Sequence, residues 1–147
     1  MITRPVLAPN ASTSLYIGGL ADVADGFRGS AIMESSQALL ATMVQLPQGT
    51  HAGTRNRPLS NGFSVPGSSQ VLIATVLKNQ YGTNTIFSIQ NTGSAAGDVT
   101  FDFYNTSASK VHSFVQNIQP GAAYFVDAGT LSGLGTSFNG SAIVEVA

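Results

Sequence analysis

The chain of 147 residues contains no cysteine and no tryptophan. The absence of cysteine excludes disulfides, thiolate metal sites and thiol nucleophiles. Charged residues are also scarce, because they make up 9% of the chain, compared with about 25% in ordinary soluble domains. A lightly charged surface is poor at keeping copies of a chain apart. The composition therefore favours self-association.

A basic patch and a long apolar run are missing as well. The net charge is −1, and the six cations are scattered along the chain apart from the pair Arg55 and Arg57. Such a distribution offers no footprint for nucleic acid or an anionic membrane. No stretch reaches the roughly 18 apolar residues of a membrane span, and the first twenty residues lack the pattern of an export signal. We expect no nucleic-acid partner and no membrane span.

An internal repeat is the most informative feature that is present. Residues 9–34 align without a gap with residues 120–145, at an offset of 111, and ten of the twenty-six positions are identical. The identical pairs are Pro9/Pro120, Ala11/Ala122, Gly18/Gly129, Leu20/Leu131, Phe27/Phe138, Gly29/Gly140, Ser30/Ser141, Ala31/Ala142, Ile32/Ile143 and Glu34/Glu145. We expect both copies to be incomplete, and repeat units that cannot bury their apolar faces alone depend on neighbours.

The pattern along the chain predicts an all-β fold, an Ig-like or Greek-key β-sandwich. Val99, Phe101 and Phe103 face one way and alternate with Asp98, Thr100, Asp102 and Tyr104, as in a strand with one wet face. Turn residues separate the runs. We expect strands near 13–17, 28–34, 37–46, 70–78, 84–90, 97–104, 109–117, 122–127 and 139–146. The predicted core is Val71, Ile73, Ile86, Phe87, Ile89, Val99, Phe101, Phe103, Val115, Phe125, Val126 and Val144.

Three segments follow from this pattern. Residues 1–46 form a partial repeat that supplies strands, residues 47–67 form an irregular linker rich in proline and glycine, and residues 68–147 form the sandwich. Residues 35–45 match residues 68–78 at six of eleven positions. Two buried strands drawing on the same residue types would explain this match. The alternative is that both segments can occupy similar positions, which would suit strand exchange between subunits.

Several short motifs, in a fixed order, resemble those of tandem β-sandwich modules in large secreted and surface proteins of filamentous Chloroflexi-type bacteria. They are Asn61-Gly62-Phe63, Leu77-Lys78-Asn79, residues 81–85, residues 89–94, Val99-Thr100-Phe101, residues 118–121, and residues 138–142 with their twin 27–31. The resemblance covers most of residues 4–46 and 61–147. It implies an extracellular, stalk-like or adhesive role, and it carries over no catalytic residues.

A search for sites of chemistry finds little. His51 and His112 have no second histidine at metal-ligand spacing, whereas metal sites need three or four converging ligands. Asp22, Asp25 and Glu34 could contribute to a calcium site, but a solvated outward face is the simpler interpretation. No nucleophile elbow, phosphate loop or acid and base pair is present. We assign no catalytic, cofactor-binding or metal residues and expect no enzyme activity.

The function predicted from the sequence is that of an extracellular structural subunit. It would assemble head-to-tail into a fibre, sheath or surface array by β-strand addition. The predicted interface is a run that is apolar on both faces together with the end of the last strand: Leu39, Leu40, Ala41, Met43, Val44, Leu46, Val144 and Val146. We expect the sheet that ends at Val146 to have an open edge. The alternative is a passive adhesive or carbohydrate-binding β-sandwich module excised from a larger surface protein, with glycan as a partner.

Overall fold

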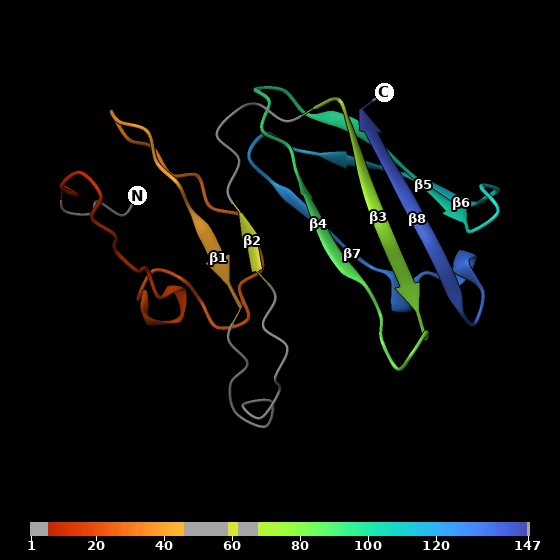
Figure 1. Ribbon diagram of the computed structural model, residues 1–147. Coiled ribbons are helices and arrows are strands. Elements are labelled where there is room, and N and C mark those ends of the chain that lie inside the picture. Colours follow the sequence, from red (N-terminus) through yellow and green to blue (C-terminus); the bar gives the residue numbers. More distant parts are fainter. Residues whose placement is uncertain (1–5, 46–58, 62–67, 147) are drawn as a thin grey trace.

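The computed structural model describes residues 6–45, 59–61 and 68–146, and its regular structure is almost entirely antiparallel strands (Figure 1). The prediction of an all-β fold is confirmed. The strands are β1 (Thr42–Val44), β2 (Leu59–Asn61), β3 (Gln70–Lys78), β4 (Ile86–Gln90), β5 (Gly97–Asn105), β6 (Lys110–Ile118), β7 (Ala123–Asp127) and β8 (Phe138–Val146). Short 3-10 turns occur at η1 (Ile17–Gly19), η3 (Ala128–Thr130) and η4 (Ser132–Leu134).

Residues 68–146 form a sandwich of two unequal sheets. One sheet has the order β3-β8-β5-β6, and the other contains β4 and β7. The chain passes from one sheet to the other between β3 and β4, between β4 and β5, between β6 and β7, and between β7 and β8. This interlocked order, with β4 paired to β7 and β5 paired to β8, is of the Greek-key kind found in Ig-like sandwiches.

The hydrophobic core lies between the two sheets. Phe101 and Phe103 are fully buried on β5, and Val126 contributes from β7 in the opposite sheet. Phe101 stacks on Phe114 with ring centroids 4.7 Å apart. The complete set of buried apolar residues is Val76, Val99, Phe101, Phe103, Ile118, Val126, Ala128, Leu134, Phe138, Ala142 and Val144.

Four residues of the predicted core, Val71, Ile86, Val115 and Phe125, do not lie in it. Val115 is 60% exposed, because β6 turns its alternate residue Phe114 inward. Ile86 is 59% exposed, because Phe87 and Ile89 occupy the inner face of β4. Val71 is 38% exposed, because it lies near the end of the edge strand β3. Ile73, Phe87 and Ile89 pack against the core while partly buried, whereas Phe125 is half-buried outside the core cluster.

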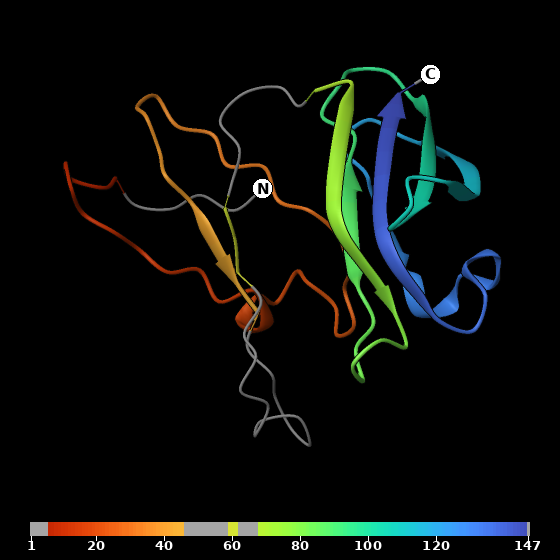
Figure 2. The same cartoon turned by 45° about the vertical axis from the view of Figure 1, so that its right-hand side comes forward.

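Residues 6–45 differ from the sandwich, because they bury almost nothing. The predicted strands at 13–17 and 28–34 are absent, and the predicted strand at 37–46 is reduced to β1. β1 pairs with β2, which falls in the segment predicted to be irregular. Both views show β1 and β2 to one side of the sandwich (Figures 1 and 2). Within the part of the chain that the structure describes, residues 9–34 have no sheet partner, so their apolar residues alone do not produce strands.

The last strand is not a sheet edge, which corrects the prediction of an open edge at Val146. β8 lies in the middle of its sheet and pairs with β3 on one side and with β5 on the other. Among the described residues, the outer strands of that sheet are β3 and β6. In the smaller sheet, β4 and β7 each have a strand on one side only.

Candidate assembly interface

The residues predicted to form the interface lie in very different surroundings. Leu40 is 92% exposed, Met43 54%, Val44 47% and Leu39 44%, and Ala41 is half-buried. Val146 is 52% exposed, but Val144 is 2% exposed and belongs to the core. Leu46 lies outside the described residues. The structure therefore leaves the apolar side chains around β1 accessible, and it removes Val144 from any surface.

The first copy nevertheless keeps the local turns of the second copy. At the end of η1, the Leu20 N–H donates to the Ile17 carbonyl oxygen at 3.0 Å, and in the turn that follows the Val23 N–H donates to that of Leu20 at 3.1 Å. At an offset of 111, Leu131 donates to Ala128 at 3.3 Å and Leu134 donates to Leu131 at 3.1 Å. The two copies therefore share the conformation of these turns as well as their sequence. Only the second copy continues into a strand.

The order of segments in the first copy is permuted relative to the sandwich. Residues 9–34 correspond to the β7 to β8 region, and residues 35–45, which follow directly, correspond to the start and body of β3. In the sandwich these regions are spatial neighbours, because the Val146 N–H donates to the Ser69 carbonyl oxygen at 2.9 Å. Gln70 also donates to the Glu145 carboxylate at 3.0 Å. Residues 9–45 thus carry the sequences of strands that pair in the complete fold.

The capping hydrogen bond before β3 also recurs in the first copy. The Gln70 N–H donates to Ser68 Oγ at 3.1 Å, and the Gln37 N–H donates to Ser35 Oγ at 3.2 Å. Identical local bonds arise because a serine hydroxyl two residues earlier satisfies the same backbone donor. The segment that contains β1 therefore begins with the same local hydrogen bond as the strand β3.

The sheet edges differ in how they are protected. Within β3, the register shifts between Ile73 and Val76, and the β5–β6 pairing shifts between Phe103 and Tyr104. Such bulges are a common protection against the addition of further strands. The β4–β7 ladder is regular over its five pairs, and neither strand contains proline or lysine. The smaller sheet therefore has the less protected edges.

A polar cluster around Asp102 lies on the outer face of the larger sheet. Asp102 is 8% exposed, accepts a hydrogen bond from Ser113 Oγ at 2.6 Å and pairs with Lys110 Nζ at 3.0 Å. The Ser113 hydroxyl and the Lys110 ammonium together hold the pKa of Asp102 below its ordinary value, against the opposing effect of burial. All the partners of this carboxylate come from β6, so the cluster fixes the β5–β6 pairing.

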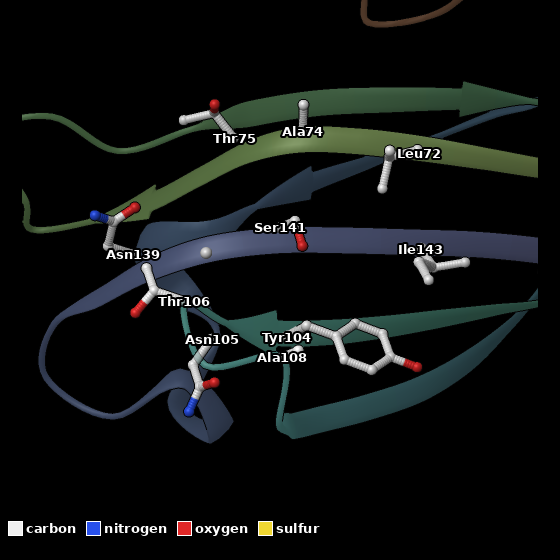
Figure 3. Close-up of a pocket in the computed structure, with 11 residues that line it drawn as sticks. Leu72, Ala74, Thr75, Tyr104, Asn105, Thr106, Ala108, Asn139, Ser141 and Ile143 are labelled. Atoms are coloured by element: carbon white, nitrogen blue, oxygen red, sulfur yellow. The ribbon is translucent and has the colours of Figure 1, made fainter.

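An open groove of about 600 Å³ also lies on that outer face (Figure 3). Tyr104 and Ile143 form part of its floor, and the side chains of Asn105, Asn139 and Ser141 add polar groups. The remaining lining comes from Leu72, Ala74, Thr75, Thr106, Ala108 and Gly140. An aromatic ring with neighbouring amides and hydroxyls is chemically suited to a neutral polar ligand, including a glycan. Sequence alternation placed Tyr104 on this face but gave no indication of a groove.

The candidate metal and histidine residues do not converge. Among residues 6–45, 59–61 and 68–146, no three His, Asp or Glu side chains lie close enough to hold a metal ion. Asp22, Asp25 and Glu34 are exposed in the first copy. The His112 ring lies among aromatics, with its centroid 5.8 Å from that of Phe103 and 5.9 Å from that of Phe114. His51 lies outside the described residues.

Comparisons with known proteins give no family for this chain. No protein-family model matches it, and no curated protein or solved structure matches it at a significant level. In the part of the chain that the structure describes, no helix is long and apolar enough to span a membrane.

Proposed function

We propose that the protein is an extracellular structural subunit that assembles head-to-tail into a fibre, sheath or surface array by β-strand addition. One observation carries the proposal. An apolar segment with strand geometry, around β1, is exposed, while the sandwich in the same chain has a two-stranded sheet with weakly protected edges. An exposed apolar strand that pairs with β2 alone and a two-stranded sheet with open edges are complementary. The extracellular location rests on the resemblance to surface modules.

The size of the apolar segment sets the strength of each contact. Fully burying a large apolar side chain contributes about 1.5–3 kcal/mol, so the four at Leu39, Leu40, Met43 and Val44 would contribute at most about 6–12 kcal/mol. Association costs about 4–15 kcal/mol in lost freedom of motion. A single contact is therefore weak to moderate, and we expect assembly to depend steeply on protein concentration.

Light scattering after gel filtration and negative-stain microscopy of the full chain test this proposal. We expect the wild-type chain to form polymers as its concentration rises. The double variant Leu40→Asp, Met43→Asp should remain monomeric, because two charges would have to be buried with the strand. Leu72→Asp is the matched control, because Leu72 is 66% exposed on the sandwich itself. A wild-type chain that stays monomeric, or a double variant that still polymerises, would contradict the proposal.

Carbohydrate binding is the second candidate function, and the groove around Tyr104 favours it (Figure 3). Sugar rings stack on aromatic side chains, while amides and hydroxyls orient the sugar hydroxyls. Binding of the chain to immobilised neutral polysaccharides would test this candidate, with Tyr104→Ala as the groove variant and Val111→Ala as a control outside the groove. Retention that is lost only in Tyr104→Ala would support binding in the groove, and equal retention of all three proteins would contradict it.

A further inference from the structure

The smaller sheet of the sandwich covers only part of the larger one. β7 lies over the β5 and β6 side, because the Tyr124 ring is 5.8 Å from that of Phe101 and 6.3 Å from that of Phe114. Beyond it, the inward-facing residues of β6 are left incompletely covered, since His112, Phe114 and Gln116 are only half-buried. An additional strand beside β7 would lie over this row.

The backbone of β7 is oriented to receive such a strand. At the two ends of the β4–β7 ladder, the Ala128 N–H donates to the Thr85 carbonyl oxygen and the Asn91 N–H donates to that of Ala122, both at 3.0 Å. Hydrogen-bonded pairs alternate along an antiparallel ladder. Tyr124 and Val126 therefore direct their peptide groups toward β4, and the N–H and C=O of Phe125 point to the other side of β7.

We infer that the free edge of β7 in one copy of the chain accepts β1 of a second copy, an inference that rests on the proposed function. β1 already pairs with β2, so docking would extend the smaller sheet to the order β2-β1-β7-β4. Four strands would then face the four of the larger sheet. A strand at this position has one face over Phe114 and His112, which suits a donor that is apolar on both faces.

The occupant is a second copy because the two halves of the contact are separate within one chain. In the structure β1 and β2 lie apart from the sandwich in both views (Figures 1 and 2). The apolar residues Leu40 and Met43 remain exposed there, at 92% and 54%. The contact joins two different surfaces of the molecule, so it is heterologous and propagates into a filament or ring.

A proline substitution distinguishes the β7 edge from the β4 edge. In Phe125→Pro the N–H that points away from β4 is removed, while the β4–β7 hydrogen bonds are kept. Ser88→Pro is the matched control, because by the same alternation the Ser88 N–H points away from β7. Phe125→Ala controls for loss of the ring. We expect Phe125→Pro to raise the concentration needed for assembly at least tenfold, while Ser88→Pro and Phe125→Ala assemble like the wild type. Circular dichroism checks that each variant is folded.

Engineered cysteines provide a second readout that does not depend on proline, because the chain has no cysteine of its own. A mixture of Met43→Cys and Phe125→Cys chains should form disulfide-linked dimers on mild oxidation, in excess of either chain alone. A folded Phe125→Pro variant that assembles normally would overturn the inference, as would assembly lost through Ser88→Pro instead. A disulfide that forms only within a Met43→Cys, Phe125→Cys double variant would also overturn it. These three results contradict the inference about β7 while the wild-type chain still assembles. A wild-type chain that stays monomeric would instead contradict the proposed function.

Discussion

Residues 9–34 and residues 120–145 are alike in sequence at ten of twenty-six positions, yet one copy is exposed and the other forms part of a core. Phe27 is 58% exposed, whereas its counterpart Phe138 is 7% exposed. The equivalent turns η1 and η3 form in the first and the second copy respectively, because each depends on hydrogen bonds between near neighbours. The strand at 138–146 forms in the second copy only, because it depends on β3 and β5 at its sides.

The difference teaches that strand formation in this chain is decided by available partners. Local structure recurs wherever the sequence recurs, but long-range pairing does not. Residues 9–45 consequently contribute only the short strand β1, which pairs with β2. The proposed assembly would supply a larger sheet from a neighbouring molecule.

The largest expected difference between the copies concerns their shared glycines. A Cβ at Gly140 would collide with the carbonyl oxygen of Tyr104 on β5, so Gly140→Val should prevent the sandwich from folding. A Cβ at Gly29 would meet only the far end of the Phe27 ring, which is exposed and can move aside. Gly29→Val should therefore fold normally. Thermal unfolding by circular dichroism measures both, and a stable Gly140→Val protein would show that the close backbone approach is not required.

The shared phenylalanines should show the next largest difference. Phe138→Ala removes a buried ring and should lower the free energy of unfolding by about 3–5 kcal/mol. Phe27→Ala should change it by less than about 0.5 kcal/mol in the monomer, as at other surface positions. Urea titration of both variants provides the values. Equal losses would mean that residues 9–34 contribute to the core of the monomer, which would contradict the comparison.

Acid should act on the sandwich through Asp102. The pKa of this residue is lowered in the folded state, first by the Ser113 hydrogen bond and then by Lys110, so its contribution to stability is present above the unfolded pKa of about 3.9. That contribution is lost as the pH falls through the lower folded pKa. Asp102→Asn should cost about 1–3 kcal/mol at neutral pH and flatten the acid limb of the stability curve. An unchanged acid limb, measured by urea titration between pH 2 and pH 7, would contradict this role.

The sequence predicts much of the sandwich because its strongest signals are local. Alternation at Val99, Phe101 and Phe103 identified both a strand and its buried face, and turn residues placed the other strands from 70 to 146 to within a few residues. In β6, however, Val115 and Phe114 are both apolar, so alternation alone did not show which one faces inward. The central place of β8 depends on pairing with β3, which is distant in sequence.

The candidate interface was predictable in part, because its apolar character is also a local signal. The run from Leu39 to Val44 is apolar at five of six positions, which identified a segment in need of burial. Its exposure, the two-stranded sheet and the half-buried row on β6 follow from the topology of the whole domain. Asp102 was predicted to face water, and it is buried because it lies on a central strand with Ser113 and Lys110 beside it.

Hydrogen exchange followed by mass spectrometry tests the central claim most directly, because strand addition converts exposed amides into sheet hydrogen bonds. The full chain would be compared at a dilute, monomeric concentration and at a concentration where it assembles. We predict that two segments gain protection together on assembly, residues 37–45 and residues 121–127, while residues 86–90 of β4, at the opposite edge of the smaller sheet, remain unchanged. Assemblies in which residues 37–45 exchange as fast as in the monomer would contradict the account.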